Sequence, residues 1–214
     1  MDVHHLNDWP AAMRLLLFSD LHADLDQARA LVERSRDFDL VIGAGDFGNL
    51  RRQLREPIEI LSQITCPAVL VAGNNESTEE LRDACHAWPT AHVLHSSGVT
   101  LQGVEFWGIG GGIPVTPFGD WSYDFSEDEA DQLLSGCPRN AVLVSHSPPK
   151  GILDLSSQGK SLGSEAVRRA IKDKAPQLVV CGHIHASGGR SVLVEKTHVV
   201  NAGPAGIEWS LPTR

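Results

Sequence analysis

Polar side chains of the types that bind metal ions follow five short apolar runs along the chain. Each run has the length and composition of a buried strand, and the polar residues begin where the run ends. Ligands of open α/β sheets bind outside the carboxyl ends of the strands. We therefore expect these polar clusters to converge on one site. The clusters are Asp20-Leu21-His22, Gly45-Asp46, Gly73-Asn74-Asn75-Glu76, Ser145-His146 and Gly182-His183-Ile184-His185.

The converging side chains are carboxylates, an amide and imidazoles. Oxygen and nitrogen donors together suit a pair of divalent transition metals rather than a sulfur-bound structural zinc. Two metal ions that share a carboxylate can clamp a phosphoryl group and acidify a water molecule near neutral pH. The candidate metal ligands are Asp20, His22, Asp46, Asn74, His146, His183 and His185.

The elements that must position these residues alternate between strand-like and helix-like patterns, which predicts a layered α/β fold with mixed sheets. We expect a single domain over residues 13–214, after a polar tail at residues 1–12 that includes His4 and His5. Strands are predicted at 14–19, 40–44, 68–72, 92–95, 99–101, 104–109, 141–145, 178–181, 191–195 and 198–201. Helices are predicted at 24–36, 50–64, from Ser77 onward, 126–134 and 164–174.

The composition narrows the class of partner and the compartment. The chain has 214 residues and a net charge of −9. Proteins that bind long DNA or RNA depend on Lys and Arg contacts, so we do not expect long nucleic acid as a partner. The four widely spaced cysteines form no disulfide framework, so we expect a reducing, cytoplasmic compartment. The sequence contains no run of 18 apolar residues, so we expect no membrane span. We also expect no signal peptide, because the basic and apolar pattern of one is missing. A small phosphorylated molecule is the expected partner.

The ordered set DxH, GDxxN, GNxE, a lone histidine after a strand and GHxH resembles the calcineurin-like metallophosphoesterases. The match runs from Asp20 to His185 and, with the closing Asn201-Ala-Gly-Pro, covers nearly the whole domain. The stretches GGGIPVTPFGDWSYDFSEDEA, SHSPPKG and VVCGHIH also resemble a branch of small bacterial and archaeal members. The resemblance implies a four-layer αββα sandwich with two mixed sheets.

The resemblance also implies roles for the individual residues. A first metal ion would be bound by Asp20, His22 and His185. A second metal ion would be bound by Asn74, His146 and His183. Asp46 would bridge the two ions together with a hydroxide that attacks phosphorus in line. Manganese is the metal we expect first, with iron, zinc, nickel and cobalt as alternatives. The catalytic candidates are Asp46, Asn74, Asn75 and His146.

One position departs from the family pattern. Many members carry a histidine directly after the metal-binding asparagine, where this chain has Asn75. An amide donates a hydrogen bond but supplies no proton between pH 5 and 8. We therefore expect weaker help for poor leaving groups such as alkyl alcohols. Asp24 and Asn49 are candidates, by proximity, for the acceptors that orient the ligand imidazoles.

Other polar and aromatic residues have plainer explanations. We expect His86, His92, His95 and His198 to be structural, and Arg51, Arg52 and Arg55 to form a solvated helix face. Glu76 serves either the ligands or the following helix N-terminus. Gly110-Gly111-Gly112 lacks the Lys and Ser/Thr of a P-loop, so a turn is the default interpretation. The aromatic residues near this run either stack on a base or aryl group or pack in the core or a lid; they are Phe118, Trp121 and Tyr123.

We expect a phosphoesterase that acts on a phosphomonoester or phosphodiester. Two alternatives remain open, namely a nuclease on short oligonucleotides and an attenuated family member that acts as a binding module. Specificity is expected in the loop after Gly108, in residues 148–151 and in residues 156–164.

Overall fold

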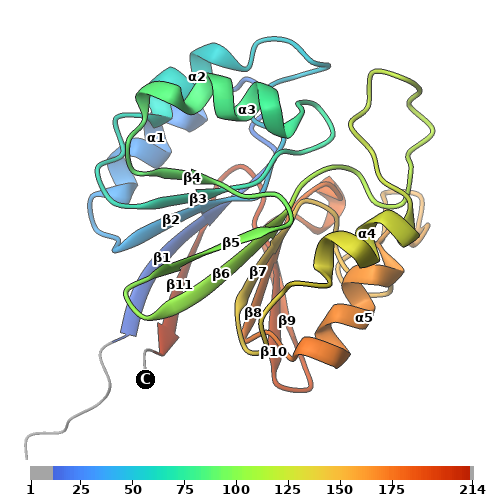
Figure 1. The fold of residues 1–214 in the computed structure, drawn as a ribbon. Helices are drawn as coiled ribbons and strands as arrows, with labels where there is room; N and C mark the ends of the chain where they lie inside the picture. Colours follow the sequence, from blue (N-terminus) through green and yellow to red (C-terminus); the bar gives the residue numbers. More distant parts are fainter. Residues whose placement is uncertain (1–11, 213–214) are drawn as a thin grey trace, which may run out of the picture.

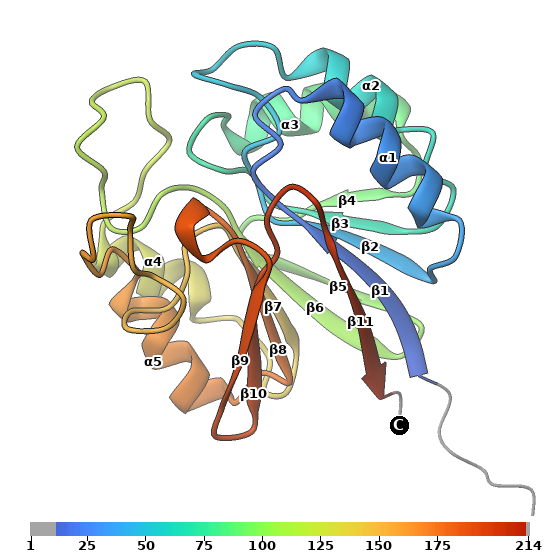
Figure 2. The ribbon, with the colours of Figure 1, turned by 180° about the vertical axis from the view of Figure 1, so that it is seen from behind.

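Two β-sheets lie face to face in the computed structural model, which describes residues 12–212, and helices cover both outer faces (Figures 1 and 2). This arrangement confirms the predicted αββα sandwich. Residues 1–11 of the expected tail, including His4 and His5, lie outside the described residues, and Ala12 begins the first strand. No helix within residues 12–212 is long and apolar enough to cross a membrane.

The first sheet has parallel strands at its centre and one antiparallel edge strand. Its order is β11 (Ile207–Pro212), β1 (Ala12–Phe18), β2 (Leu40–Gly43), β3 (Ala68–Leu70) and β4 (Ala91–Val93), with β11 antiparallel to β1. Its outer face is covered by α1 (Leu25–Ser35), α2 (Arg55–Leu61) and α3 (Thr78–Ala84), and the short helix η1 (Cys85–Ala87) follows α3 (Figure 1).

The second sheet is also mixed. Its order is β5 (Ser97–Leu101), β6 (Val104–Ile109), β7 (Val142–Ser145), β8 (Leu178–Cys181), β10 (Thr197–Asn201) and β9 (Arg190–Val194). The strands β6, β7, β8 and β10 are parallel, and the edge strands β5 and β9 are antiparallel to their neighbours. The outer helices are α4 (Glu127–Leu134) and α5 (Glu165–Lys174), and η2 (His185–Ser187) follows β8.

The central strands are continuous apolar runs because both of their faces are buried. In β1, Leu15 and Leu17 pack into the core between the two sheets, whereas Leu16 and Phe18 pack beneath the helices of the first sheet. A strand alternates its side chains between two faces, so one run of apolar residues supplies both cores. The four thiols of Cys66, Cys85, Cys137 and Cys181 are free.

One predicted helix is much shorter in the structure. The helix expected at 50–64 spans only Arg55–Leu61, because Leu50, Arg51 and Gln53 have φ values of 48°, 59° and 56°, which no right-handed helix contains. Arg51 and Arg52 therefore lie on a loop and not on the expected helix face.

The edge strand β11 was not predicted from the sequence. Its residues Ile207, Trp209 and Leu211 alternate with polar ones, a signal that is readable but short. Antiparallel pairing with β1 makes the strand, in a register that places Leu211 opposite Met13.

The Ser126 side chain caps α4 and offers a test of the local structure. Ser126 Oγ accepts a hydrogen bond from the Glu129 N–H, and the Glu129 carboxylate accepts one from the Ser126 N–H. Ser126→Ala should lower the free energy of unfolding by about 1 kcal/mol in urea titration, because it leaves helix N–H groups without a partner. Ser135→Ala at the other end of α4 is the control, and an equal loss in both variants would contradict the assignment.

Candidate metal centre

The predicted ligands lie beyond the carboxyl ends of five parallel strands, β1, β2 and β3 in one sheet and β7 and β8 in the other. The first group of side chains comes from β1 and β8. His22 Nε2 lies 2.9 Å from His185 Nε2, and His185 Nε2 lies 3.7 Å from Asp20 Oδ1. His22 and His185 are 163 residues apart in the chain. They come together because the two sheets that carry them pack face to face.

The second group comes from β3, β7 and β8. His146 Nε2 lies 3.3 Å from Asn74 Oδ1, and the rings of His146 and His183 are 5.0 Å apart, edge to face. The carboxylate of Asp46 lies between the two groups. Its Oδ2 is 3.7 Å from His22 Nε2, and its Oδ1 is 3.5 Å from His146 Nε2.

Five of these side chains have donor atoms close enough together to hold divalent cations, and His183 belongs to neither of the two sets that they form. Two sets have donor atoms within 4.8 Å of one another, namely Asp20 with His22 and His185, and Asp20 with Asp46 and His146. The two sets share Asp20, and the two oxygens of Asp46 face one histidine of each group. Imidazole, carboxylate and amide donors together fit transition metals of the manganese-to-zinc series.

Four of the candidate ligands have left-handed backbone conformations. The φ values are 58° at Asp20, 47° at His22, 58° at Asp46 and 65° at His183. Non-glycine residues adopt this region rarely and at an energetic cost, and such residues concentrate at functional sites. Hydrogen bonds between neighbouring loops hold the backbone there, from Asp20 N–H to the Gly45 carbonyl (2.9 Å) and from His22 N–H to the Asp46 carbonyl (3.0 Å).

Two glycines that precede ligands permit close approach of the loops. A Cβ at Gly73 would lie 1.9 Å from Asp46 Oδ1, and a Cβ at Gly182 would lie 2.5 Å from Asp20 Oδ2. Both distances are far below van der Waals contact, so any side chain there would displace a carboxylate. The Gly-Asn and Gly-His pairs of the sequence are thus a packing requirement of the site.

The ligand side chains are oriented by partners that sequence reasoning missed. His146 Nδ1 hydrogen-bonds to the Ala44 carbonyl at 2.7 Å, which leaves Nε2 directed at Asp46. The amide nitrogen of Asn74 donates to Ser122 Oγ at 3.2 Å, which turns the amide oxygen toward His146. Ser122 lies 48 residues from Asn74 in the chain, and no local signal points to it.

Asp24 and Asn49, which we expected to orient the ligand imidazoles, make other contacts instead. Asp24 caps α1, where its Oδ1 accepts a hydrogen bond from the Gln27 N–H at 2.9 Å. Asn49 pairs with Arg52 through backbone hydrogen bonds in a tight turn. Proximity in sequence was therefore a wrong guide to the partners of the imidazoles.

Asn75 faces the carboxylate of Asp46. Its amide nitrogen donates to Asp46 Oδ2 at 2.6 Å, and its backbone N–H donates to Asp46 Oδ1 at 2.9 Å. Its amide oxygen accepts a hydrogen bond from the Leu50 N–H at 2.8 Å. The Asn75 side chain is thus engaged on both sides and positions the carboxylate.

Glu76 is fully buried behind the centre and serves the ligand loop. Its carboxylate accepts hydrogen bonds from the backbone N–H groups of Asp46 (2.8 Å), Gly48 (3.1 Å) and Gly73 (2.8 Å). The following helix is instead capped by Ser77 and Glu80, which form a capping box. Of the two roles open for Glu76, the structure therefore shows the one at the ligand loop.

Burial and mutual charge shift the pKa values of the cluster. Burial would raise the pKa of Asp46, but His146 and His22 together lower it below its ordinary value. Burial lowers the pKa of His183 to about 3, so its imidazole is neutral. Burial also opposes protonation of His146, yet Asp46 raises the pKa of His146 to about 9. A cation bound by His146 would compete with that proton, which makes metal binding depend on pH.

Burial also shifts the pKa of the Glu76 carboxyl. Burial raises its pKa to about 7, and the charge of Asp46 acts in the same direction, while the N–H groups of Gly73 and Gly48 oppose the rise.

Within residues 12–212, the remaining histidines and the glycine run lie outside the cluster. His86 Nδ1 contacts the Asp83 carbonyl, and His198 packs edge to face on Trp209. The backbone N–H groups of the glycine run all donate hydrogen bonds within the protein. Gly110 donates to the His95 ring, Gly111 to the Ala72 carbonyl and Gly112 to the Tyr123 carbonyl. The run is therefore a turn and not a phosphate cradle. The side chain of His92 is half-buried on β4.

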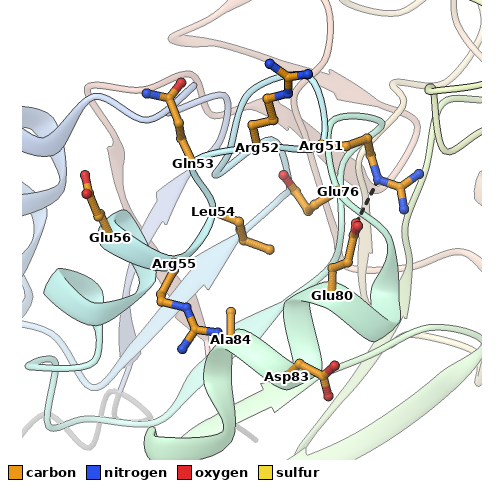
Figure 3. Close-up of a pocket in the computed structure, with 10 residues that line it drawn as sticks. All are labelled: Arg51, Arg52, Gln53, Leu54, Arg55, Glu56, Glu76, Glu80, Asp83 and Ala84. Atoms are coloured by element: carbon orange, nitrogen blue, oxygen red, sulfur yellow. Dashed lines mark hydrogen bonds and ion pairs between the residues drawn. The ribbon is translucent and has the colours of Figure 1, made fainter.

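A separate hollow of about 490 Å³ lies behind the centre, between the loop before α2 and the helix α3 (Figure 3). None of the seven candidate ligands lines it, but Glu76 does. Arg51 pairs there with Glu80 at 2.8 Å, and Arg52 and Arg55 are exposed at its rim. The hollow carries both charge signs and is distinct from the ligand cluster.

Several solved structures share the fold of this chain. The protein TT1561 of Thermus thermophilus has 19% identity and a TM-score of 0.73, with 91% of each chain covered. A dimetal phosphatase from Danio rerio has 13% identity and a TM-score of 0.60, with 90% of this chain and 87% of that chain covered. The phosphopantetheinyl hydrolase of Mycobacterium tuberculosis has 14% identity and a TM-score of 0.54, with 91% and 90% covered.

At these identities the similarity establishes the fold alone. A search of curated protein sequences finds no match. The sequence pattern of the calcineurin-like phosphoesterase superfamily domain, however, matches residues 13–213, nearly the whole chain. The motifs, the sandwich and this match agree, and the chain belongs to the calcineurin-like phosphoesterase superfamily.

Proposed function

We propose that this protein is a dinuclear metal-dependent hydrolase of a phosphomonoester or phosphodiester. The observation that carries the proposal is the position of the Asp46 carboxylate, with one oxygen facing His22 and the other facing His146. The first ion would be held by Asp20, His22 and His185. The second would be held by the other three candidates, Asn74, His146 and His183, with Asp46 shared.

Two divalent ions held there would supply electrostatic stabilisation of the phosphoryl group and a water molecule of lowered pKa. The chain itself contributes position. Asn75 and Glu76 hold Asp46 and its backbone, and Ser122 turns the Asn74 amide. Manganese is the metal we propose first, and the cytoplasm is the proposed compartment, since four free thiols suit a reducing environment.

Replacement of the shared carboxylate tests the proposal directly. Asp46→Asn should lower manganese-dependent hydrolysis of bis(p-nitrophenyl) phosphate and p-nitrophenyl phosphate by at least about 100-fold, since loss of an outer partner alone typically costs about 10- to 100-fold. The measurement is initial rate after chelator treatment and refilling with manganese. Native protein that binds no metal and turns over neither ester would contradict the proposal and favour a binding module.

The Glu76 side chain tests the support of the ligand loop. Glu76→Gln should weaken manganese binding by about 10- to 100-fold, because the amide keeps one oxygen for the N–H groups of Asp46 and Gly73 but its NH₂ cannot accept from the Gly48 N–H. Titration calorimetry measures the affinity. Glu79→Gln is the matched control, because Glu79 is exposed on α3. Equal affinities in both variants would show that Glu76 does not support the metal ligands.

The engaged amide of Asn75 predicts a leaving-group preference. A lost general acid typically costs about 10²- to 10⁴-fold, and the cost falls on alkyl esters because aryl oxygens leave without a proton. The ratio of aryl to alkyl phosphate turnover should therefore be large in the native protein and smaller in Asn75→His. Asn75→Ala, which also lacks a proton donor, should slow both esters alike. Equal turnover of aryl and alkyl esters by native protein would refute this prediction.

A further inference from the structure

Exposed apolar side chains gather on the loops around the candidate metal centre. Among residues 12–212, seven large apolar side chains are exposed, and five of them lie on three loops, at 48–54, 110–126 and 147–164. Figure 2 shows the last two loops on one side of the molecule, next to the turn at η2 that carries His185. The five are Leu50, Val115, Phe118, Leu155 and Leu162, and the other two are Val192 and Leu193 of β9.

The loop at 110–126 is bonded directly to a candidate ligand. Ser122 Oγ accepts the hydrogen bond from the Asn74 amide at 3.2 Å, and the Tyr123 N–H donates to the Asn74 carbonyl at 3.0 Å. The carboxylate of Asp124 closes the base of the loop, because it accepts from the Thr116 N–H at 2.9 Å and from Ser122 Oγ at 2.8 Å. The loop is therefore held at its base beside the centre, while its tip projects from the fold (Figure 1).

Two aromatic rings on this loop are already stacked. The Phe118 and Trp121 ring centres are 5.7 Å apart with an angle of 15° between the planes, and Phe118 is 51% exposed. Trp121 precedes Ser122, and its carbonyl accepts a hydrogen bond from Arg51 at 3.3 Å. An ordered ring with a face open to solvent can extend its stack to a further flat ring. We call Phe118 and Trp121 the aromatic platform.

We propose that the aromatic platform binds a flat aromatic group of the phosphoester substrate. This inference rests on the proposed function and adds the substrate class to it. Ser122 follows Trp121 and accepts a hydrogen bond from Asn74, so the platform lies on a segment anchored at the centre and can meet the organic part of a phosphoester bound there. The chemistry of Asn75 agrees, because a site without a proton donor at that position suits an aryl leaving group.

A binding comparison tests the platform without any need for turnover. Phenylphosphonate and methylphosphonate share the phosphoryl-like group and differ in the ring. In manganese-loaded native protein, phenylphosphonate should bind at least about fivefold more tightly by titration calorimetry, the size expected of one aromatic stack. In the Phe118→Ala/Trp121→Ala double variant the ratio should fall to within about twofold of unity, because both rings of the stack are lost. Leu193→Ala, which removes a similarly exposed side chain from β9, should keep the native ratio, and the single variant Trp121→Phe should retain most of it.

Turnover separates this inference from the proposed function. In the double variant, KM for p-nitrophenyl phosphate should rise at least about fivefold with kcat nearly unchanged, as expected when uniform binding is lost. Acetyl phosphate, which has an acidic but non-aromatic leaving group, should be unaffected. A native phenyl preference that survives in the double variant, or no preference in native protein, would overturn the platform. A platform-dependent preference without hydrolysis of any ester would uphold the platform and refute the hydrolase.

Discussion

The buried carboxylate of Asp46 is the constraint on which the rest of the site depends. It must face His22 from one sheet and His146 from the other, so both of its oxygens are fixed. Two donors from Asn75 hold those oxygens, Glu76 holds the backbone beneath them, and the lack of a Cβ at Gly73 leaves room for them. A buried charge is costly unless hydrogen bonds and opposite charges surround it, and here neighbouring loops supply them.

This position is reached through unfavourable backbone geometry. Left-handed conformations at Asp20, His22, Asp46 and His183 each cost about 1 kcal/mol or more. They persist because the ligand loops hydrogen-bond to one another above two sheets whose strands are buried on both faces. The sandwich therefore does more than bring distant residues together. Its stability maintains loops that would relax to ordinary conformations in a short peptide.

Much of the fold was readable from local patterns. Apolar runs such as residues 15–18 mark buried strands, and serine three residues before an acid, as at Ser77 and Ser126, marks helix starts that the structure contains. These signals depend on residues within one element. The start of the helix expected over 50–64 was wrong, because side-chain spacing says nothing about the φ values that a contact elsewhere imposes. The Leu50 N–H donates a hydrogen bond to Asn75 in the loop before the helix.

The family and the kinds of donor at the strand ends follow from local motifs, because each motif is a few residues long and keeps its order along the chain. The directions in which those side chains face depend instead on how the fold packs. Asn75 donates a hydrogen bond to Asp46, 29 residues away in the chain, and Glu76 accepts one from the Asp46 N–H, 30 residues away. Asn74 donates one to Ser122, 48 residues away. Such contacts depend on how two sheets and their loops meet in space, and no local pattern in the chain specifies that meeting.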